Sequence, residues 1–424
     1  MTLEERSDLV LSFARVLFVN GQSTDQTLEA ASRLADSVGV DSKILVHWGE
    51  IQLHAEDHEE RLISVVCARP TGVDMNRVAS TMEVINDLQS GRRASSEAIK
   101  TIGVIAQAHP SPDWLFTLAA AAGAVALAVI FGVQHLPAAG IIFVSAGAGA
   151  ILRRRLGRFS ANVFIQPFCA SLLAGLIGAL AFRYQLSSTL RLVAVCPCMV
   201  LVPGPHLLNG ALDLVRGRIG LGTARLVFAA LVILAISAGL LVGLAIFGVS
   251  FPVDPTGRSV TLWLDTIAAG VAVFAYSMFF STPLRMVAWP IAIGMLAHAM
   301  RWLLLVELHR NAATGAMVAC LIAGLILAPV AHKWRMPFAA VGFAAVVSMM
   351  PGVFLFRMAG GLVQLTNPSL ASFGLLSATA SDGMTAIAII LAMSFGLIVP
   401  KMISDRLFEG SRQTTSGGGT NANR

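Results

Sequence analysis

The spacing of apolar and polar side chains divides the chain into two parts. Up to residue 112, apolar positions alternate with charged ones at helix and strand periods, whereas long apolar runs dominate from Trp114 onward. The first pattern is typical of a folded domain with a core, and the second is typical of membrane spans. We therefore predict a small α+β domain over 1–112, followed by a helical membrane part.

Within the first part, residues 3–19 carry apolar side chains at the period of an amphipathic helix. Ser23 and Gln26 have the spacing of a capping box, so a second helix is predicted to begin at Ser23 and to end near Gly39. Short runs with strand character predict a small sheet, and helical patterns follow it. The predicted strands are 43–48, 51–53 and 61–68, and the later helices are 74–88 and 96–108.

Ten apolar runs after Trp114 approach the length that crosses a bilayer. Pro or Gly interrupts several of them, and the second and fourth are short. The predicted spans are 114–133, 137–152, 161–182, 188–203, 222–249, 261–280, 286–305, 312–331, 338–356 and 381–400.

Composition supports the membrane assignment, since 56% of residues are hydrophobic and 13% are charged, against roughly 25% charged in soluble domains. The net charge is +6, and the basic residues lie mainly in the loops that follow the even-numbered spans, as at 153–158 and 216–225. They do not form a patch for nucleic acid. By the positive-inside rule, both termini are predicted to be cytoplasmic, as in a polytopic inner-membrane protein. The loop 251–259 is predicted to be external.

The two halves of the membrane part resemble each other at one offset. The Trp-Leu pair at 114–115 recurs 149 positions later at 263–264, and the Leu-Ile-rich run at 172–177 recurs at 321–326. Each half holds five spans, and because five is odd the second copy is expected to be inverted, as in many secondary transporters. The expected division is 1–112 for the domain, 113–250 and 251–402 for the repeats, and 403–424 for a disordered cytoplasmic tail.

Each half also contains a Pro-Gly pair inside an apolar run, Pro203-Gly204 and Pro351-Gly352. Proline lacks the backbone donor that a helix needs and glycine tolerates unusual dihedrals, so a helix is predicted to break at both pairs. Polar backbone freed at membrane depth is tolerated only against protein or a water-filled cavity. The two breaks therefore predict a binding site.

After the first break, Asn209, Asp213 and Arg216 fall at i, i+4 and i+7 on one helix face. Such a stripe can bind a zwitterion, with Asp213 toward an ammonium group and Arg216 toward a carboxylate, and Asp213 can also carry a proton. The alternative is that Asp213 and Arg216 pair at the cytoplasmic interface and only fix topology. His206 is either a proton relay or a packing residue.

The second half carries different polar groups. Arg357 stands where the first copy has Asn209, and its alternative role is to snorkel to the surface. Asp265 and Asp382 lie inside the sixth and tenth spans, where a carboxylate is a functional hypothesis by default, although both are near predicted ends and can be solvated there. Further candidates are His298, Arg301 and Glu307.

Other chemistry is not indicated. His47, His54 and His58 lie near acidic residues but match no metal-ligand spacing, and Cys196 and Cys198 read as buried small side chains. The spans carry no His-Glu-x-x-His motif or nucleophile–base pair, so we expect no catalytic residues, no metal and no cofactor.

The order of these features resembles a known family. The chain begins with a domain of about 110 residues and continues with five spans, the Pro-Gly-x-x-Leu-x-x-x-x-x-Asp-Leu motif at 203–214 and a second block with its own Pro-Gly. This arrangement resembles the threonine/serine exporter family. The resemblance covers about residues 5–405 and implies ten helices, proton-driven export and amino-acid substrates such as threonine or serine. Its split two-protein relatives export succinate.

Three readings stay open at this point. The first is a proton-coupled exporter of threonine or serine that works by alternating access. A dicarboxylate exporter is the second, and its site should be richer in cations than in Asp. A membrane-embedded enzyme is the third. The domain over 1–112 is expected to regulate transport or to dimerise the chain, giving a homo-oligomer.

Overall fold

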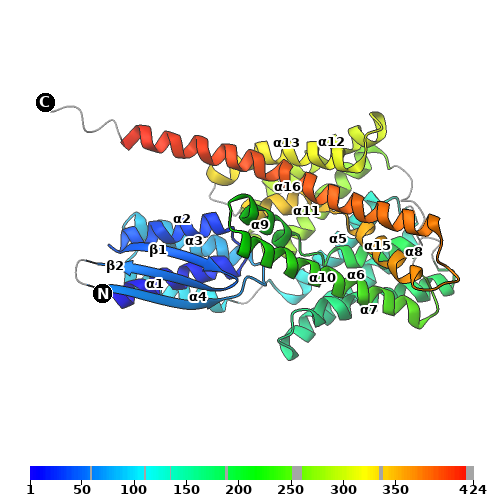
Figure 1. Cartoon of the computed structure of the whole chain (residues 1–424), viewed down its shortest axis with the longest axis horizontal. Coiled ribbons are helices and arrows are strands. Elements are labelled where there is room, and N and C mark those ends of the chain that lie inside the picture. The colour runs from blue at the N-terminus through cyan, green and yellow to red at the C-terminus, as the bar shows by residue number, and fades with distance from the viewer. Residues whose placement is uncertain are drawn as a thin grey trace.

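The computed structural model describes residues 1–57, 60–108, 111–133, 135–186, 190–250, 260–333 and 338–416. The N-terminal domain forms one end of an elongated molecule, and a bundle of helices forms the rest (Figure 1). The predicted external loop 251–259 and His58 lie outside the described residues.

The N-terminal domain combines four helices with a three-stranded antiparallel sheet in the order β1-β2-β3. This confirms the small α+β domain, and the predicted third strand is a full partner in the middle of the sheet. The elements are α1 (Leu3–Val19), α2 (Thr24–Ser37), β1 (Asp41–His47), β2 (Gly49–Glu56), β3 (Arg61–Ala68), α3 (Met75–Gln89) and α4 (Ser95–Gln107).

Strand β2 shows why one face of the sheet is covered. Its residues Ile51, Leu53 and Ala55 are buried because side chains alternate across a strand and α1 packs against β2 and β3. The capping box predicted at Ser23 is wrong: the Ser23 hydroxyl donates to the Gln26 side chain, and no side-chain cap forms. A capping box stands instead at the start of α1, between Thr2 and Glu5.

Eight helices of the membrane part are long and apolar enough to span a bilayer, and two further bent pairs raise the number to ten if each pair is one span. Prolines and glycines between the paired helices account for the bends. The elements are α5 (Asp113–Ile130), α6 (Leu136–Phe159), α7 (Ile165–Arg183), α8 (Leu190–Met199), α9 (Gly204–Val215), α10 (Ile219–Ile246), α11 (Leu262–Phe279), α12 (Leu284–Trp302), the π-helix η1 (Leu303–Glu307), α13 (Ala312–Lys333), α14 (Phe338–Val346), the 3₁₀ turn η2 (Val347–Met349), α15 (Gly352–Leu365) and α16 (Phe373–Ser416).

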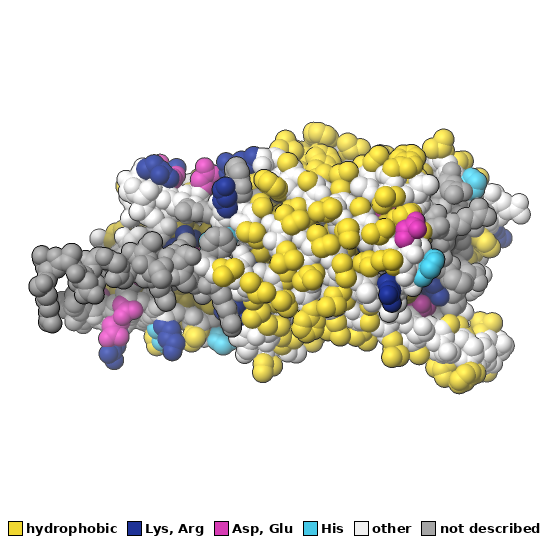
Figure 2. Space-filling model, turned by 90° about the horizontal axis from the view of Figure 1, so that it is seen from above, with side chains coloured by type: hydrophobic (Ala, Val, Ile, Leu, Met, Phe, Trp, Pro, Cys, Tyr) yellow, Lys and Arg dark blue, Asp and Glu magenta, His cyan; other side chains and the backbone are white. Residues whose placement is uncertain are grey.

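The surface of these helices is apolar where a bilayer would lie. Only 39% of the most apolar stretch of α10 is buried inside the molecule, and large side chains such as Leu234 and Val242 are exposed. Figure 2 shows apolar side chains over the middle of the membrane part and charged ones toward its ends. An apolar belt of this kind is matched by lipid rather than by water.

Three pairs of helices in the membrane part pack extensively against each other. Helix α7 lies against α10 and α13 lies against α16, while α5 packs on α11. Glycines let the backbones approach closely, since a methyl group at Gly324 would lie 2.8 Å from the Gly396 carbonyl oxygen and one at Gly243 would lie 2.9 Å from the Leu176 nitrogen. Each pair is therefore a tightly packed unit.

The last helix differs from its prediction at both ends. Helix α16 begins at Phe373, so Asp382 lies more than two turns inside it rather than at its start. The backbone also remains helical to Ser416, beyond the boundary at 403 that the polar composition predicted for the tail. Residues 417–424 lie outside the described chain.

Candidate functional site

The first break is built by two prolines. Helices α8 and α9 meet at 55°, and Pro203 has no N–H for the carbonyl of Met199. The Tyr276 hydroxyl of α11 donates to that carbonyl at 3.1 Å instead. Pro205 likewise offers no N–H to the carbonyl of Leu201, so this carbonyl lacks its helical donor at a residue that lines the cavity described next.

A cavity of about 740 Å³ lies beside this break. Its walls come from the loop before α3, the start of α5, the end of α6, the start of α7, the break itself and the end of α11. Because the N-terminal domain supplies Thr71 to Asp74, the cavity lies between that domain and the membrane helices. Its size is within the range of small-molecule sites.

Charged groups in this cavity are mostly on α6. Asp113 accepts hydrogen bonds from Arg154 and, at 3.0 Å, from Arg158. Arg153 instead stacks over the Phe279 ring, 5.3 Å from its centroid, and makes no ion pair within the described residues. The cavity therefore presents one guanidinium that no carboxylate neutralises.

A second, small cavity shares Arg153 and Phe279 with the first. It has room for about one water, and Ser145 and Pro197 are among its lining residues. The Ser145 hydroxyl is 1% exposed and has no hydrogen-bond partner in the described part of the chain. A buried hydroxyl without a partner is costly, so a ligand oxygen or a water would complete it.

Asp74 forms the rim of the cavity on the side of the N-terminal domain. Its carboxylate accepts hydrogen bonds from the backbone of Asn76 and Arg77 and so caps α3. Burial raises the pKa of Asp74, because removal from water disfavours the charged form more than these hydrogen bonds favour it.

His206 is the one member of the predicted substrate or proton set that lines the cavity. Its ring is buried, meets the Phe228 ring edge-on at 5.1 Å and is hydrogen-bonded to the backbone of Thr71. The residue thus joins the cavity wall to the N-terminal domain.

The predicted stripe on α9 faces the N-terminal domain and not the cavity. The Asn209 amide donates to the Gly21 carbonyl at 3.2 Å, and Arg216 donates to Asp25 of α2 at 3.0 Å. In this arrangement the N-terminal domain occupies the helix face on which the zwitterion site was predicted.

Asp213 lies at the centre of this contact. It is 1% exposed, its carboxylate lies 3.1 Å from the Arg225 guanidinium of α10 and 3.4 Å from Arg218, and it makes no ion pair with Arg216 in the described chain. Arg225 is fully buried and lies 3.4 Å from the Thr24 hydroxyl. Sequence reasoning missed Arg225, although a cation near the start of an apolar span was the available signal.

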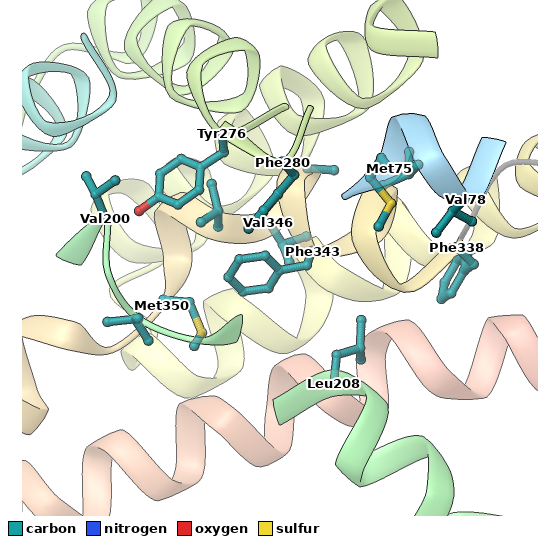
Figure 3. Close-up of a cluster of buried hydrophobic side chains, with 14 of the residues drawn as sticks. Met75, Val78, Val200, Leu208, Tyr276, Phe280, Phe338, Phe343, Val346 and Met350 are labelled. Carbon is teal, nitrogen blue, oxygen red and sulfur yellow. The ribbon is translucent and has the colours of Figure 1, made fainter. Parts of the chain in front are cut away.

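The second break has the same bend and a different lining. Helix α14 and its 3₁₀ turn meet α15 at 56°, and the space there, of about 20 Å³, is lined mainly by apolar side chains. Figure 3 shows Phe343 of α14 between Phe280 and Leu208, with α3 of the N-terminal domain nearby. This side of the crossing is packed shut.

Arg357, beyond the second break, does not snorkel. It is 8% exposed, and its guanidinium lies 3.0 Å from Asp382 of α16. The packing of α15 against α16 brings the two together. The ion pair thus neutralises both groups inside the bundle.

The remaining candidates form a third buried pair. Asp265 in the first turn of α11 lies 2.6 Å from Nδ1 of His298 on α12, and Arg301 follows one turn later. Both Asp265 and His298 are buried, so the alternative that Asp265 is solvated at the end of its span does not apply. Glu307 ends the π-helix and is exposed.

No group of three metal-binding side chains occurs among the described residues. His47 and His54 lie on the sheet, and Cys196 and Cys198 are buried.

Comparison with known proteins places the chain in a family. Residues 8–247 match the family described as "Putative threonine/serine exporter" (ThrE), and residues 265–403 match "Threonine/Serine exporter, ThrE". The chain belongs to the threonine/serine exporter family. The resemblance inferred from the motif at 203–214 is therefore confirmed, and members of this family are transporters.

A relative in Mycobacterium tuberculosis (strain ATCC 25618 / H37Rv) carries the name "Probable threonine/serine exporter". It is 23% identical over 423 residues, which cover 95% of this chain and 77% of that protein. No solved structure gives a significant match.

Proposed function

We propose that this protein exports threonine or serine across the bacterial inner membrane, in exchange for protons, by alternating access between two inverted five-span repeats. The observation that carries the proposal is Arg153, a guanidinium without an ion pair in the described chain, in a cavity beside the broken span. Family membership supplies the substrate class.

The cavity offers a partner for each group of a hydroxylated amino acid. Arg153 would bind the carboxylate, because a guanidinium pairs well with two oxygens in a plane. The backbone carbonyl of Leu201, left without a donor by Pro205, would accept from the ammonium group. The Ser145 hydroxyl and the Gln166 amide would then meet the substrate hydroxyl.

Inverted repeats are supported by the pairing of the two breaks. The bent pairs lie 148 positions apart, at Pro203 and Pro351, and each second helix packs against the first helix of the other pair. Repeats of five spans that place their broken helices together at mid-membrane are a recurring transporter arrangement.

The direction of opening follows from the same cavity. Its rim is formed by Thr71 to Asp74 of the N-terminal domain, which we place in the cytoplasm with both termini, so the cavity is on the side from which an exporter loads.

The test is transport by the full chain in everted membrane vesicles, with labelled threonine, serine and succinate. Arg153→Gln should raise the threonine concentration for half-maximal uptake about 10- to 100-fold, because a charged hydrogen bond to the carboxylate is lost. Arg155→Gln is the matched control, since Arg155 is exposed on the same helix and does not line the cavity. Equal behaviour of the two variants would contradict the assignment of Arg153.

A dicarboxylate exporter is the second candidate, and one observation favours it. The cavity holds three arginines, Arg153, Arg154 and Arg158, against two carboxylates. Succinate uptake that exceeds threonine and serine uptake in the same vesicles would establish this alternative. Threonine uptake without succinate uptake would exclude it.

A further inference from the structure

Among the described residues, three carboxylates are buried in the membrane part between α9 and α16, and their partners differ. Asp213 and Asp382 each lie within 3.1 Å of an arginine guanidinium. Asp265 lies instead 2.6 Å from a histidine, His298. Protonating either of the first two would leave a buried arginine without its counter-ion, which is strongly unfavourable.

The histidine of the third pair can accept a proton without breaking an ion pair. Its Nδ1 faces Asp265, while its Nε2 is buried and has no hydrogen-bond partner in the described residues. A carboxylate on one ring nitrogen stabilises the imidazolium that forms when the other nitrogen takes a proton. Since the whole side chain is 0% exposed, this nitrogen meets water only when the bundle opens.

We propose that Asp265 and His298 form the proton-binding site of the exporter, with Arg301 setting its charge. This inference rests on the proposed exchange of substrate for protons, and it places the proton site apart from the substrate cavity beside Pro203.

The charges around the pair define the change on protonation. Arg301 is the nearest cation on α12, and the thiol of Cys320 on α13 lies close to Arg301. Glu307 at the end of the π-helix η1 is the nearest further carboxylate on an element packed against α12, and its side chain is exposed. The described elements α5, α14 and η2, which also pack on α11 or α12, bring no charged side chain to this end. One proton therefore changes the cluster from neutral to singly positive.

The place of the pair in the fold suits a proton that enters from outside. Asp265 lies in the first turn of α11, and His298 lies near the other end of α12, close to the π-helix at 303–307. In the proposed orientation this is the external end of both helices. π-helical turns often mark functional sites, because they shift the register of a helix locally.

Helix α11 also connects the pair to the substrate cavity. Tyr276, whose hydroxyl supports the first break, lies eleven residues after Asp265, about 16 Å along the helix. Phe279, under the Arg153 guanidinium, follows on the same helix. A tilt of α11 on protonation would therefore move the wall of the cavity.

The experiment separates proton coupling from substrate movement in everted vesicles that hold the full chain. Labelled threonine uptake is measured with an acid interior, and exchange is measured without a pH gradient in vesicles preloaded with unlabelled threonine. In His298→Gln and Asp265→Asn, the rate of gradient-driven uptake should be at least about tenfold lower than in wild type. The rate of exchange should stay within about twofold of wild type. His135→Gln is the control, as an exposed histidine at the start of α6.

A second readout detects the proton directly. Threonine is added to purified protein in weakly buffered detergent solution with a pH dye, and wild type should release a proton that both variants do not release. If His298→Gln elutes as an aggregate, Asp265→Asn carries the test.

The outcomes are distinguishable. Gradient-driven uptake and proton release at wild-type levels in the variants would overturn the proton site and leave the exporter intact. Neither uptake nor exchange of threonine or serine by wild type would overturn the proposed function itself.

Discussion

The two broken spans have nearly the same backbone and different surroundings. Their bends are 55° and 56°, and each follows from a Pro-Gly pair. The first opens on a cavity with three arginines, whereas the second is sealed by Phe343, Met350 and other apolar side chains. The comparison teaches that the break supplies a hinge and free carbonyls, while the neighbouring side chains decide which break contacts solute.

The buried ion pairs beside the two breaks show a second contrast. Asp213 on α9 faces Arg225 on α10, whereas Arg357 on α15 faces Asp382 on α16, so acid and base exchange places between the halves. In both cases a neutral ion pair joins the helix that follows the break to the next helix along the chain. The helix that carries the acid in one half carries the base in the other.

The largest effect is expected from breaking the first ion pair. Asp213→Asn leaves the fully buried Arg225 without its main counter-ion, and such a loss costs about 3–5 kcal/mol. Thermal unfolding of the full chain in detergent measures it. The double replacement Asp213→Leu with Arg225→Leu should recover most of the stability, and a double variant as unstable as the single one would contradict the explanation.

A smaller difference is expected between the two glycines at the breaks. A methyl group at Gly204 would overlap the rigid Phe343 ring, whereas one at Gly352 would lie 3.0 Å from the flexible Met199 side chain. Gly204→Ala should therefore destabilise the protein by about 1–3 kcal/mol. Gly352→Ala is the matched control and should cost less in the same unfolding assay. Equal costs would show that the two breaks are packed alike.

The smallest effect concerns Asp74, at the contact of domain and cavity. Its pKa is raised by burial, so the folded state holds the proton more tightly than the unfolded chain, and stability falls as pH rises from the unfolded pKa of about 3.9 through the folded pKa. Asp74→Asn keeps an N-cap and does not titrate. Calorimetry should show that the stability of the variant depends less on pH in this range than that of wild type. Above this range the variant should be at least as stable as wild type. A decrease at neutral pH would contradict this reading.

Local features were predictable from the sequence, and contacts between distant segments were not. Helix and strand periods, proline and glycine positions and apolar length located the N-terminal domain and the two breaks, because these depend on residues near in sequence. The contacts of the stripe with Asp213 could not be predicted, because its partners Gly21, Thr24 and Asp25 lie about 190 positions earlier in the sequence. Arg153 was taken for a topological charge, and only the fold shows that it faces a cavity.

Arg225 also constrains how the chain is made. A lone arginine costs up to about 2.5–3.5 kcal/mol on insertion into a bilayer, the full value applying at the centre of a span. Arg225 lies in the second turn of α10, and its partners Asp213 and Thr24 precede it in the chain. Both have left the ribosome before α10 does. The N-terminal domain can thus fold first and pair with the arginine as the helix inserts. The order of synthesis then lowers the cost of inserting this charged residue into the bilayer.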